Sequence, residues 1–118
     1  MKIKQKKAIN AFTTLSQMGK KITGKTAWDL YRLKQRLKEA VDFQSEEEMK
    51  LVEKYGGSVD EAGRIQIPDE NREAFMKDFT ELGELECEID LEVTADLNNI
   101  RDINMAEIEA LDGIVQFK

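Results

Sequence analysis

The strongest constraint on the fold is a strict alternation of apolar and acidic residues over positions 84–93. Side chains two positions apart lie on the same face of a β-strand, so this alternation predicts a strand with one buried and one solvated face. The acidic members are Glu84, Glu86, Glu88, Asp90 and Glu92. The apolar members Leu85, Ile89, Leu91 and Val93 are expected to pack beneath Phe75, Phe79, Leu33 and Leu37.

Helical periodicity predicts two helices in the first half of the chain. One covers residues 5–18, where the apolar side chains fall on a single face. A much longer one is expected from Thr26, its predicted N-cap, toward Tyr55. Ser45 and Glu48 fit a capping box, so a break or bend near Ser45 stays open, although one long helix is favoured.

The second half of the chain predicts shorter elements. A hairpin with Gly63 in its turn is expected over 58–67. Asp69 is expected to cap a third helix after Pro68, and Asn104 a short one over 105–111. A last strand is expected over 114–117. The predicted class is α+β, with a long helix packed with a shorter antiparallel helix against a small, mainly antiparallel β-sheet.

The residue inventory excludes several classes of function. The chain has 118 residues, the size of one domain, so 1–118 is expected to be a single domain. Histidine is absent, which excludes Ser-His-Asp and Cys-His catalysis and His-containing zinc sites. The single cysteine, Cys87, excludes an internal disulfide and a four-cysteine metal site, and on the apolar face it is expected to be inert. The sequence also has no GxGxxG or Walker motif, so nucleotide binding has no support. No pair of carboxylates is placed in a partly apolar pocket that would shift its pKa values, so we expect no enzyme activity and no cofactor.

The sequence predicts neither membrane insertion nor secretion. No apolar run reaches the roughly 18 residues that a membrane-spanning helix needs. The N-terminus is basic, but no apolar segment follows it as in a secretory signal.

Charge is distributed very unevenly along the chain. Residues 1–43 carry 11 Lys and Arg against 3 Asp and Glu, whereas residues 44–118 carry 7 against 21. The simplest interpretation is that the two halves fold against each other and partly neutralise. Alternatives are a basic arm for nucleic acid, or an acidic surface for a basic partner. The overall acidity makes nucleic-acid binding the less favoured of these.

The five carboxylates of the alternating segment are the candidate partner-binding residues: Glu84, Glu86, Glu88, Asp90 and Glu92. The simplest interpretation is a solvated edge strand whose charges prevent sheet-to-sheet aggregation. The functional interpretation is an acidic ladder that docks a basic protein surface or mimics a phosphate backbone. A calcium or magnesium site is less favoured, because a straight strand splays ligands that a metal needs to converge.

Two aromatic residues on the long helix support a further alternative. Trp28 and Tyr31 match the apolar stripe of that helix and are expected in the core or in an interface. In the second case the chain would self-associate through the long helix, as a structural or assembly protein.

Several segments, in order, carry a resemblance to a known family: MKIKQKKAINAFTTLSQM, LVEKYG, DEAGRIQI, FMKDFTELGELECEID and INMAEIEALDGIV. Together they resemble a family of small, functionally uncharacterised proteins from tailed phages and prophages of Gram-positive bacteria. The resemblance spans nearly the whole chain and implies an accessory phage protein in the cytoplasm of a bacterial host cell. It implies no catalytic or binding residues.

The function expected from these observations is a non-enzymatic phage or prophage accessory protein that acts as a protein-interaction module. Its acidic face would contact a host or phage protein with a basic surface, for example to inhibit a host defence system or a host enzyme. The alternatives are a virion assembly protein that self-associates through the long helix, and a nucleic-acid binder that uses the basic N-terminal region.

Overall fold

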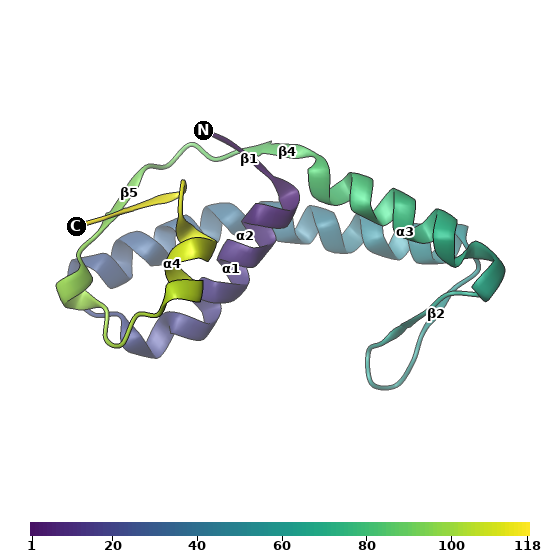
Figure 1. Ribbon diagram of the computed structural model, residues 1–118, viewed down its shortest axis with the longest axis horizontal. Helices are drawn as coiled ribbons and strands as arrows, with labels where there is room; N and C mark the ends of the chain where they lie inside the picture. The colour runs from purple at the N-terminus through teal and green to yellow at the C-terminus, as the bar shows by residue number, and fades with distance from the viewer.

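A computed structural model describes all residues, 1–118, and has the predicted α+β class. Its central element is the long helix α2, Gly24–Lys54. Figure 1 shows α1, Gln5–Met18, and α4, Met105–Leu111, at one end of α2, and α3, Asp69–Glu84, at the other. The molecule is accordingly elongated, with principal extents of 51 × 30 × 22 Å.

Helix α1 begins and ends where the sequence predicts. Its buried apolar residues are spaced three and four apart, at Ala8, Ala11, Leu15 and Met18, so they form one stripe that packs on α2. A single 3-10 turn, Gly19–Lys21, reverses the chain between the two helices. The long helix therefore packs with a shorter antiparallel helix, as expected.

Helix α2 is continuous through Ser45, so no break occurs there. The apolar stripe of the helix is interrupted in the sequence near Ser45. The reason is that a polar residue, Gln44, occupies a buried position of the stripe, where 7% of its surface is exposed. The helix also begins earlier than predicted. Thr26 lies inside its first turn, where the buried side-chain oxygen accepts hydrogen bonds from the Asp96 N–H and the Asn99 amide.

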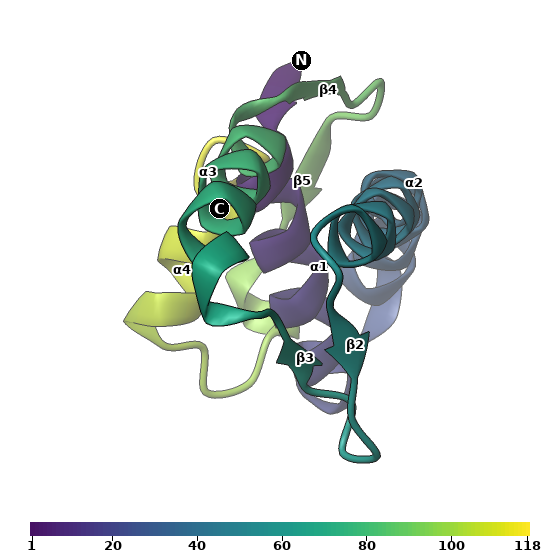
Figure 2. The same cartoon turned by 90° about the vertical axis from the view of Figure 1, so that its right-hand side faces the viewer.

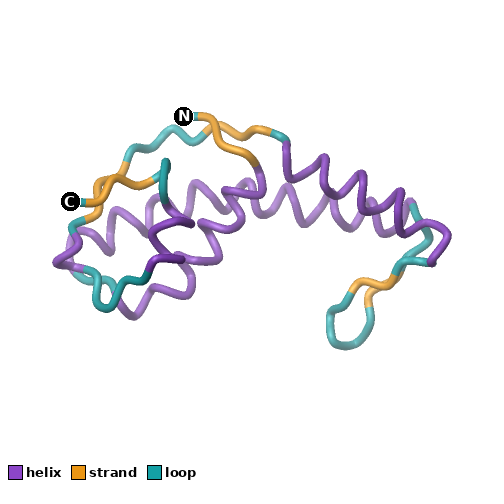
Figure 3. Tube along the Cα trace, in the orientation of Figure 1, coloured by secondary structure: helices purple, strands orange, loops and turns teal.

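The six strands form three separate pairs (Figure 3). The pair of β1, Lys2–Lys4, with β4, Glu86–Glu88, is antiparallel, as is the predicted hairpin of β2, Ser58–Val59, with β3, Ile65–Gln66. The third pair, β5, Val93–Ala95, and β6, Val115–Phe117, is parallel. Each sheet is thus only two strands wide, and none spans the molecule.

The predicted single strand over 84–93 is wrong in its extent. Helix α3 continues to Glu84, β4 covers only 86–88, and β5 begins at Val93. The reason is non-local, because β4 pairs with the N-terminal strand while β5 pairs with the C-terminal one. The alternation persists between them, since Ile89 and Val93 are buried whereas the acidic side chains are exposed.

The main hydrophobic core confirms part of the predicted packing. Leu33, Leu37, Ile89 and Val93 belong to one buried cluster, with Leu91 packed against it. Leu85 was expected in this core but is 48% exposed.

The aromatic residues of α3 pack elsewhere, over the C-terminal part of α2. Phe75 makes an edge-to-face contact with Tyr55 and stacks on Phe79, with ring centroids 6.3 and 6.1 Å apart. The Tyr55 hydroxyl donates to the Asp78 carboxylate at 2.5 Å, which fastens α3 to the end of α2. This second cluster is separate from the main core.

Candidate functional site

The five acidic candidates all lie on the surface, but on three different elements. Glu84 ends α3, Glu86 and Glu88 are on β4, and Asp90 and Glu92 lie in the segment that leads to β5. All five side chains are exposed. The structure therefore places them along one stretch of surface chain rather than on one face of a single strand.

Glu84 is held by two lysine side chains of the N-terminal segment. The Lys4 and Lys6 ammonium groups lie 2.5 and 2.6 Å from its two carboxylate oxygens. Hydrogen bonds from Lys4 and then Lys6 hold the pKa of Glu84 at about 2, below its ordinary value of 4.5. This carboxylate is already occupied by partners within the chain.

Strand β1 adds positive charge beside β4. The antiparallel register places Lys2 opposite Glu88 and Lys4 opposite Glu86, and the Met1 amino group lies 2.8 Å from a Glu88 carboxylate oxygen. The sequence reasoning missed β1. The alternation of Lys2, Ile3 and Lys4, complementary to Glu86, Cys87 and Glu88, is the signal that could have found it.

The neutralisation expected between the two halves of the chain is observed. Five ion pairs join residues 1–43 to residues 44–118. Three of them join residues 1–6 to Glu84 or Glu88. In the other two, Arg36 contacts Asp90 at 3.1 Å and Lys21 contacts Glu107 at 2.7 Å. Much of the basic N-terminal region therefore faces carboxylates of the same chain.

The outer edge of β4 is open. The Gln5 N–H donates to the Leu85 carbonyl at 2.7 Å, and the Ile89 N–H donates to the Met1 carbonyl at 2.8 Å. In an antiparallel pair the residues that bond to the partner strand alternate with residues whose N–H and C=O point the other way. The main-chain groups of Glu86 and Glu88 therefore point away from β1, toward an edge that no other strand covers.

A cavity of about 400 Å³ lies between β4 and the middle of α2. Its lining includes two exposed apolar side chains, Phe43 at 43% and Leu85 at 48% exposure, and the half-buried Cys87. Gln5 also lines it and is 2% exposed. Its side-chain N–H donates to the Ala40 carbonyl at 3.1 Å, but its side-chain oxygen has no donor. Leaving this buried acceptor unpaired costs free energy in the folded state.

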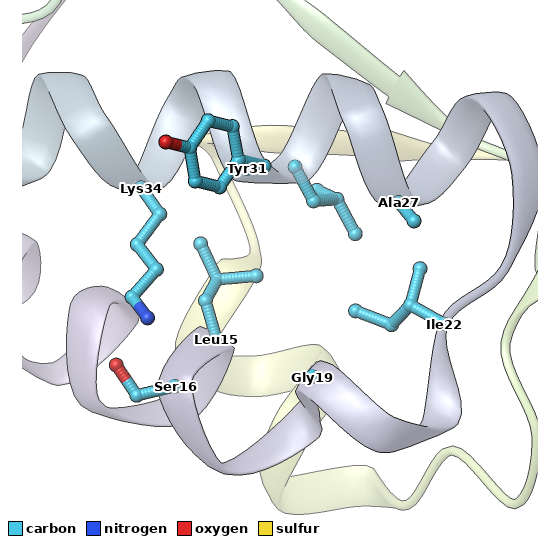
Figure 4. Close-up of a pocket in the computed structure, with 8 residues that line it drawn as sticks. Leu15, Ser16, Gly19, Ile22, Ala27, Tyr31 and Lys34 are labelled. Carbon is cyan, nitrogen blue, oxygen red and sulfur yellow. The ribbon is translucent and has the colours of Figure 1, made fainter.

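A second exposed surface lies on α2. Trp28 and Tyr31 are 61% and 53% exposed and stack with ring centroids 5.8 Å apart. The prediction that these two side chains lie in the core is therefore wrong. Tyr31 borders a cavity of about 250 Å³ between α1 and α2, into which Leu15 and Ile22 point (Figure 4).

No group of three or more Cys, Asp or Glu side chains is arranged to hold a metal ion. Burial raises the pKa of the Cys87 thiol, which favours the unreactive neutral form at pH 7.

None of the helices combines the length and the apolar character needed to cross a membrane.

Comparisons with protein-family models, curated proteins and solved structures find no match. The resemblance to phage and prophage proteins therefore stays a prediction.

Proposed function

We propose that this chain is a non-enzymatic protein-interaction module that binds an extended, basic segment of a partner protein along β4. The observation that carries the proposal is the open edge of β4 beside the cavity that Phe43 and Leu85 line. Adding a strand to an exposed sheet edge is a common way to bind a peptide, in which main-chain hydrogen bonds supply affinity and alternate side chains supply specificity.

The two faces of the β1–β4 pair define the chemistry of the bound segment. Ile3 and Cys87 pack toward the core, whereas Glu86 and Glu88 are exposed on the opposite face. In an added strand, every second side chain would enter the cavity, and the others would lie beside Glu86 and Glu88. The expected segment therefore alternates apolar residues with Lys or Arg.

The acidic residues contribute mainly to orientation and association rate. Because Lys2 and Lys4 already lie opposite Glu88 and Glu86, the net field of this surface is modest. Exposed ion pairs of this kind add little affinity but steer a charged partner, and salt weakens them. In the phage setting that the resemblance implies, the partner would be a host or phage protein in the bacterial cytoplasm, such as a defence protein or an enzyme that the chain inhibits.

Selection from a display library of random nine-residue peptides tests the proposal without naming a partner in advance. The expected result is a consensus in which apolar residues alternate with Lys or Arg. The double variant Glu86→Lys with Glu88→Lys places like charges against the Lys or Arg side chains of the selected peptides, and this repulsion should weaken their binding strongly. The matched control, Glu70→Lys with Glu73→Lys, makes the same charge change at exposed positions of α3 and should bind normally.

A second arm separates strand addition from simple charge attraction. N-methylation at alternate residues removes main-chain donors from the selected peptide and keeps its charge, so it should abolish binding. Selected peptides without alternation, or unchanged binding by the β4 variant or by the N-methylated peptide, would overturn the proposal.

A further inference from the structure

The outer face of α2 is a long surface that the chain itself leaves uncovered. Figure 2 shows α2 along one side of the molecule, with α1, α3 and α4 on the other. Exposed residues continue along this face for the whole helix: Trp28, Tyr31, Arg32, Gln35, Lys38, Glu39, Asp42, Glu46, Met49 and Glu53. A helix of 31 residues is about 46 Å long, so this face spans nearly the full length of the molecule.

Apolar side chains on this face are concentrated in two places. Trp28 and Tyr31 form a stacked pair near the start of α2, and Met49, 50% exposed, lies near its end. Exposed Trp and Tyr are the residue types most enriched at the centres of protein interfaces. Met adapts its shape and makes favourable contacts with aromatic rings.

Charge divides the same helix into two halves. The first half is basic, with Lys25, Arg32, Lys34, Arg36 and Lys38 against Asp29. The second half is mainly acidic, with Glu39, Asp42, Glu46, Glu47, Glu48 and Glu53 against Lys50 and Lys54. Arg32 and Glu46 are both exposed, and neither makes an ion pair within the chain.

We propose that two copies of this chain pair antiparallel through the outer faces of their α2 helices. When the two helices overlap over their full length, Gly24 of one copy faces Lys54 of the other. The numbers of any two facing residues therefore add up to about 78. Arg32 of each copy then faces Glu46 of the other. Trp28 of each copy lies beside Met49 of the other, and Lys25 faces Glu53.

Two-fold symmetry makes this arrangement self-complementary, because each of these three contacts occurs twice. A parallel pairing would instead place the two basic halves against each other. A uniformly acidic or uniformly basic partner would match only one half of the helix. The charge pattern therefore selects a second copy as the occupant of this face.

The proposal does not depend on binding at β4, since the outer face of α2 and the open edge of β4 are different surfaces. Sedimentation velocity on the wild-type chain from micromolar to several hundred micromolar should show a monomer–dimer equilibrium. Trp28→Ala should weaken the dimer at least about tenfold, because it removes an aromatic contact from both halves of the interface.

Charge reversal provides the decisive comparison. Arg32→Glu alone and Glu46→Arg alone each create two like-charge contacts in a homodimer, so each should weaken it about tenfold or more. An equimolar mixture of the two variants should form a heterodimer, because both contacts are again between opposite charges. The double variant, Arg32→Glu with Glu46→Arg, should form a homodimer again.

Both substitutions are at exposed positions, so circular dichroism should report a native fold for each variant. Arg101→Glu, at an exposed position outside α2, is the matched control and should dimerise as the wild type does. A wild-type chain that stays monomeric at the highest concentration would overturn the proposal. So would single variants that dimerise normally, or a mixture that stays monomeric.

Discussion

The ammonium group of Lys6 lies 2.6 Å from a carboxylate oxygen of Glu84, which joins the start of α1 to the end of α3. Lys4 contacts the other oxygen of the same carboxylate. The most acidic stretch of the chain is therefore tied to its most basic stretch at the point where β4 begins.

Glu84→Gln should lower the melting temperature slightly at pH 7 and have much less effect at pH 2. The folded-state pKa of Glu84, about 2, is below its ordinary value of 4.5. Its contribution to the free energy of unfolding is therefore complete above about pH 4.5 and is lost as the pH falls through about 2. Thermal melts at pH 7, 4.5, 3 and 2 measure the difference between variant and wild type.

Glu92→Gln is the matched control, because Glu92 is exposed and makes no ion pair. It should leave the melting temperature close to the wild-type value at every pH. A difference between Glu84→Gln and wild type that persists unchanged at pH 2 would contradict the assignment of this ion pair.

Phe75→Ala should destabilise the end of the molecule that contains α3. Phe75 is the only buried residue of α3, with 6% of its surface exposed, and its ring contacts Tyr55 and Phe79. Truncating a buried Phe costs about 3 kcal/mol or more. Hydrogen exchange should accelerate in α3 and in the β2–β3 hairpin and much less in α1, whereas Met76→Ala, at a 51% exposed neighbour, should change little.

Gly57→Ala should destabilise the junction between α2 and the hairpin. A Cβ at Gly57 would lie 2.5 Å from the Ile67 Cδ1 and 2.8 Å from the Gln66 carbonyl oxygen. Overpacking against main chain typically costs about 1–3 kcal/mol. Urea denaturation measures the loss.

Gly19→Ala is the opposite case. The site has nothing within 4 Å of the added Cβ, and its φ of −51° suits any residue. The free energy of unfolding of this variant should rise by about 0.4–1 kcal/mol, because alanine lowers the conformational entropy of the unfolded chain. Equal stability changes for the two glycine variants would show that the close approach at Gly57 has no energetic effect.

The elements predicted best from sequence are those whose signals are local. Helix α1 has one apolar face and ends where Gly19 follows, and α4 begins directly after Asn104, the predicted N-cap, which also forms a capping box with Glu107. A cap and a helical face need only neighbouring residues, so the sequence contains the whole signal.

Non-local pairing explains the elements that were missed. Strand β1 is three residues long and exists because Lys2–Lys4 meets Glu86–Glu88, more than 80 positions away. The same pairing ends β4 early, which divides the predicted ten-residue strand into β4 and β5.

The candidate site was predicted in its residues but not in its surroundings. The exposure of all five carboxylates follows from their alternation with apolar residues. Their surroundings depend on how β1, β4 and α2 come together, which local sequence does not specify. These surroundings are the lysines that face the carboxylates, the open edge of β4 and the cavity beside Phe43. Trp28 and Tyr31 match the apolar stripe of α2 only approximately, and the core is filled by Leu30, Leu33 and Leu37 without them.

Main-chain hydrogen exchange of the wild-type chain, with and without a library-selected peptide, tests strand addition at β4 most directly. The N–H groups of Glu86 and Glu88 point away from β1 and have no partner strand, so they should exchange quickly in the free protein. The account predicts that both become protected when the peptide binds, with α2 unchanged. Peptide binding that leaves the exchange of these two amides unaltered would contradict it.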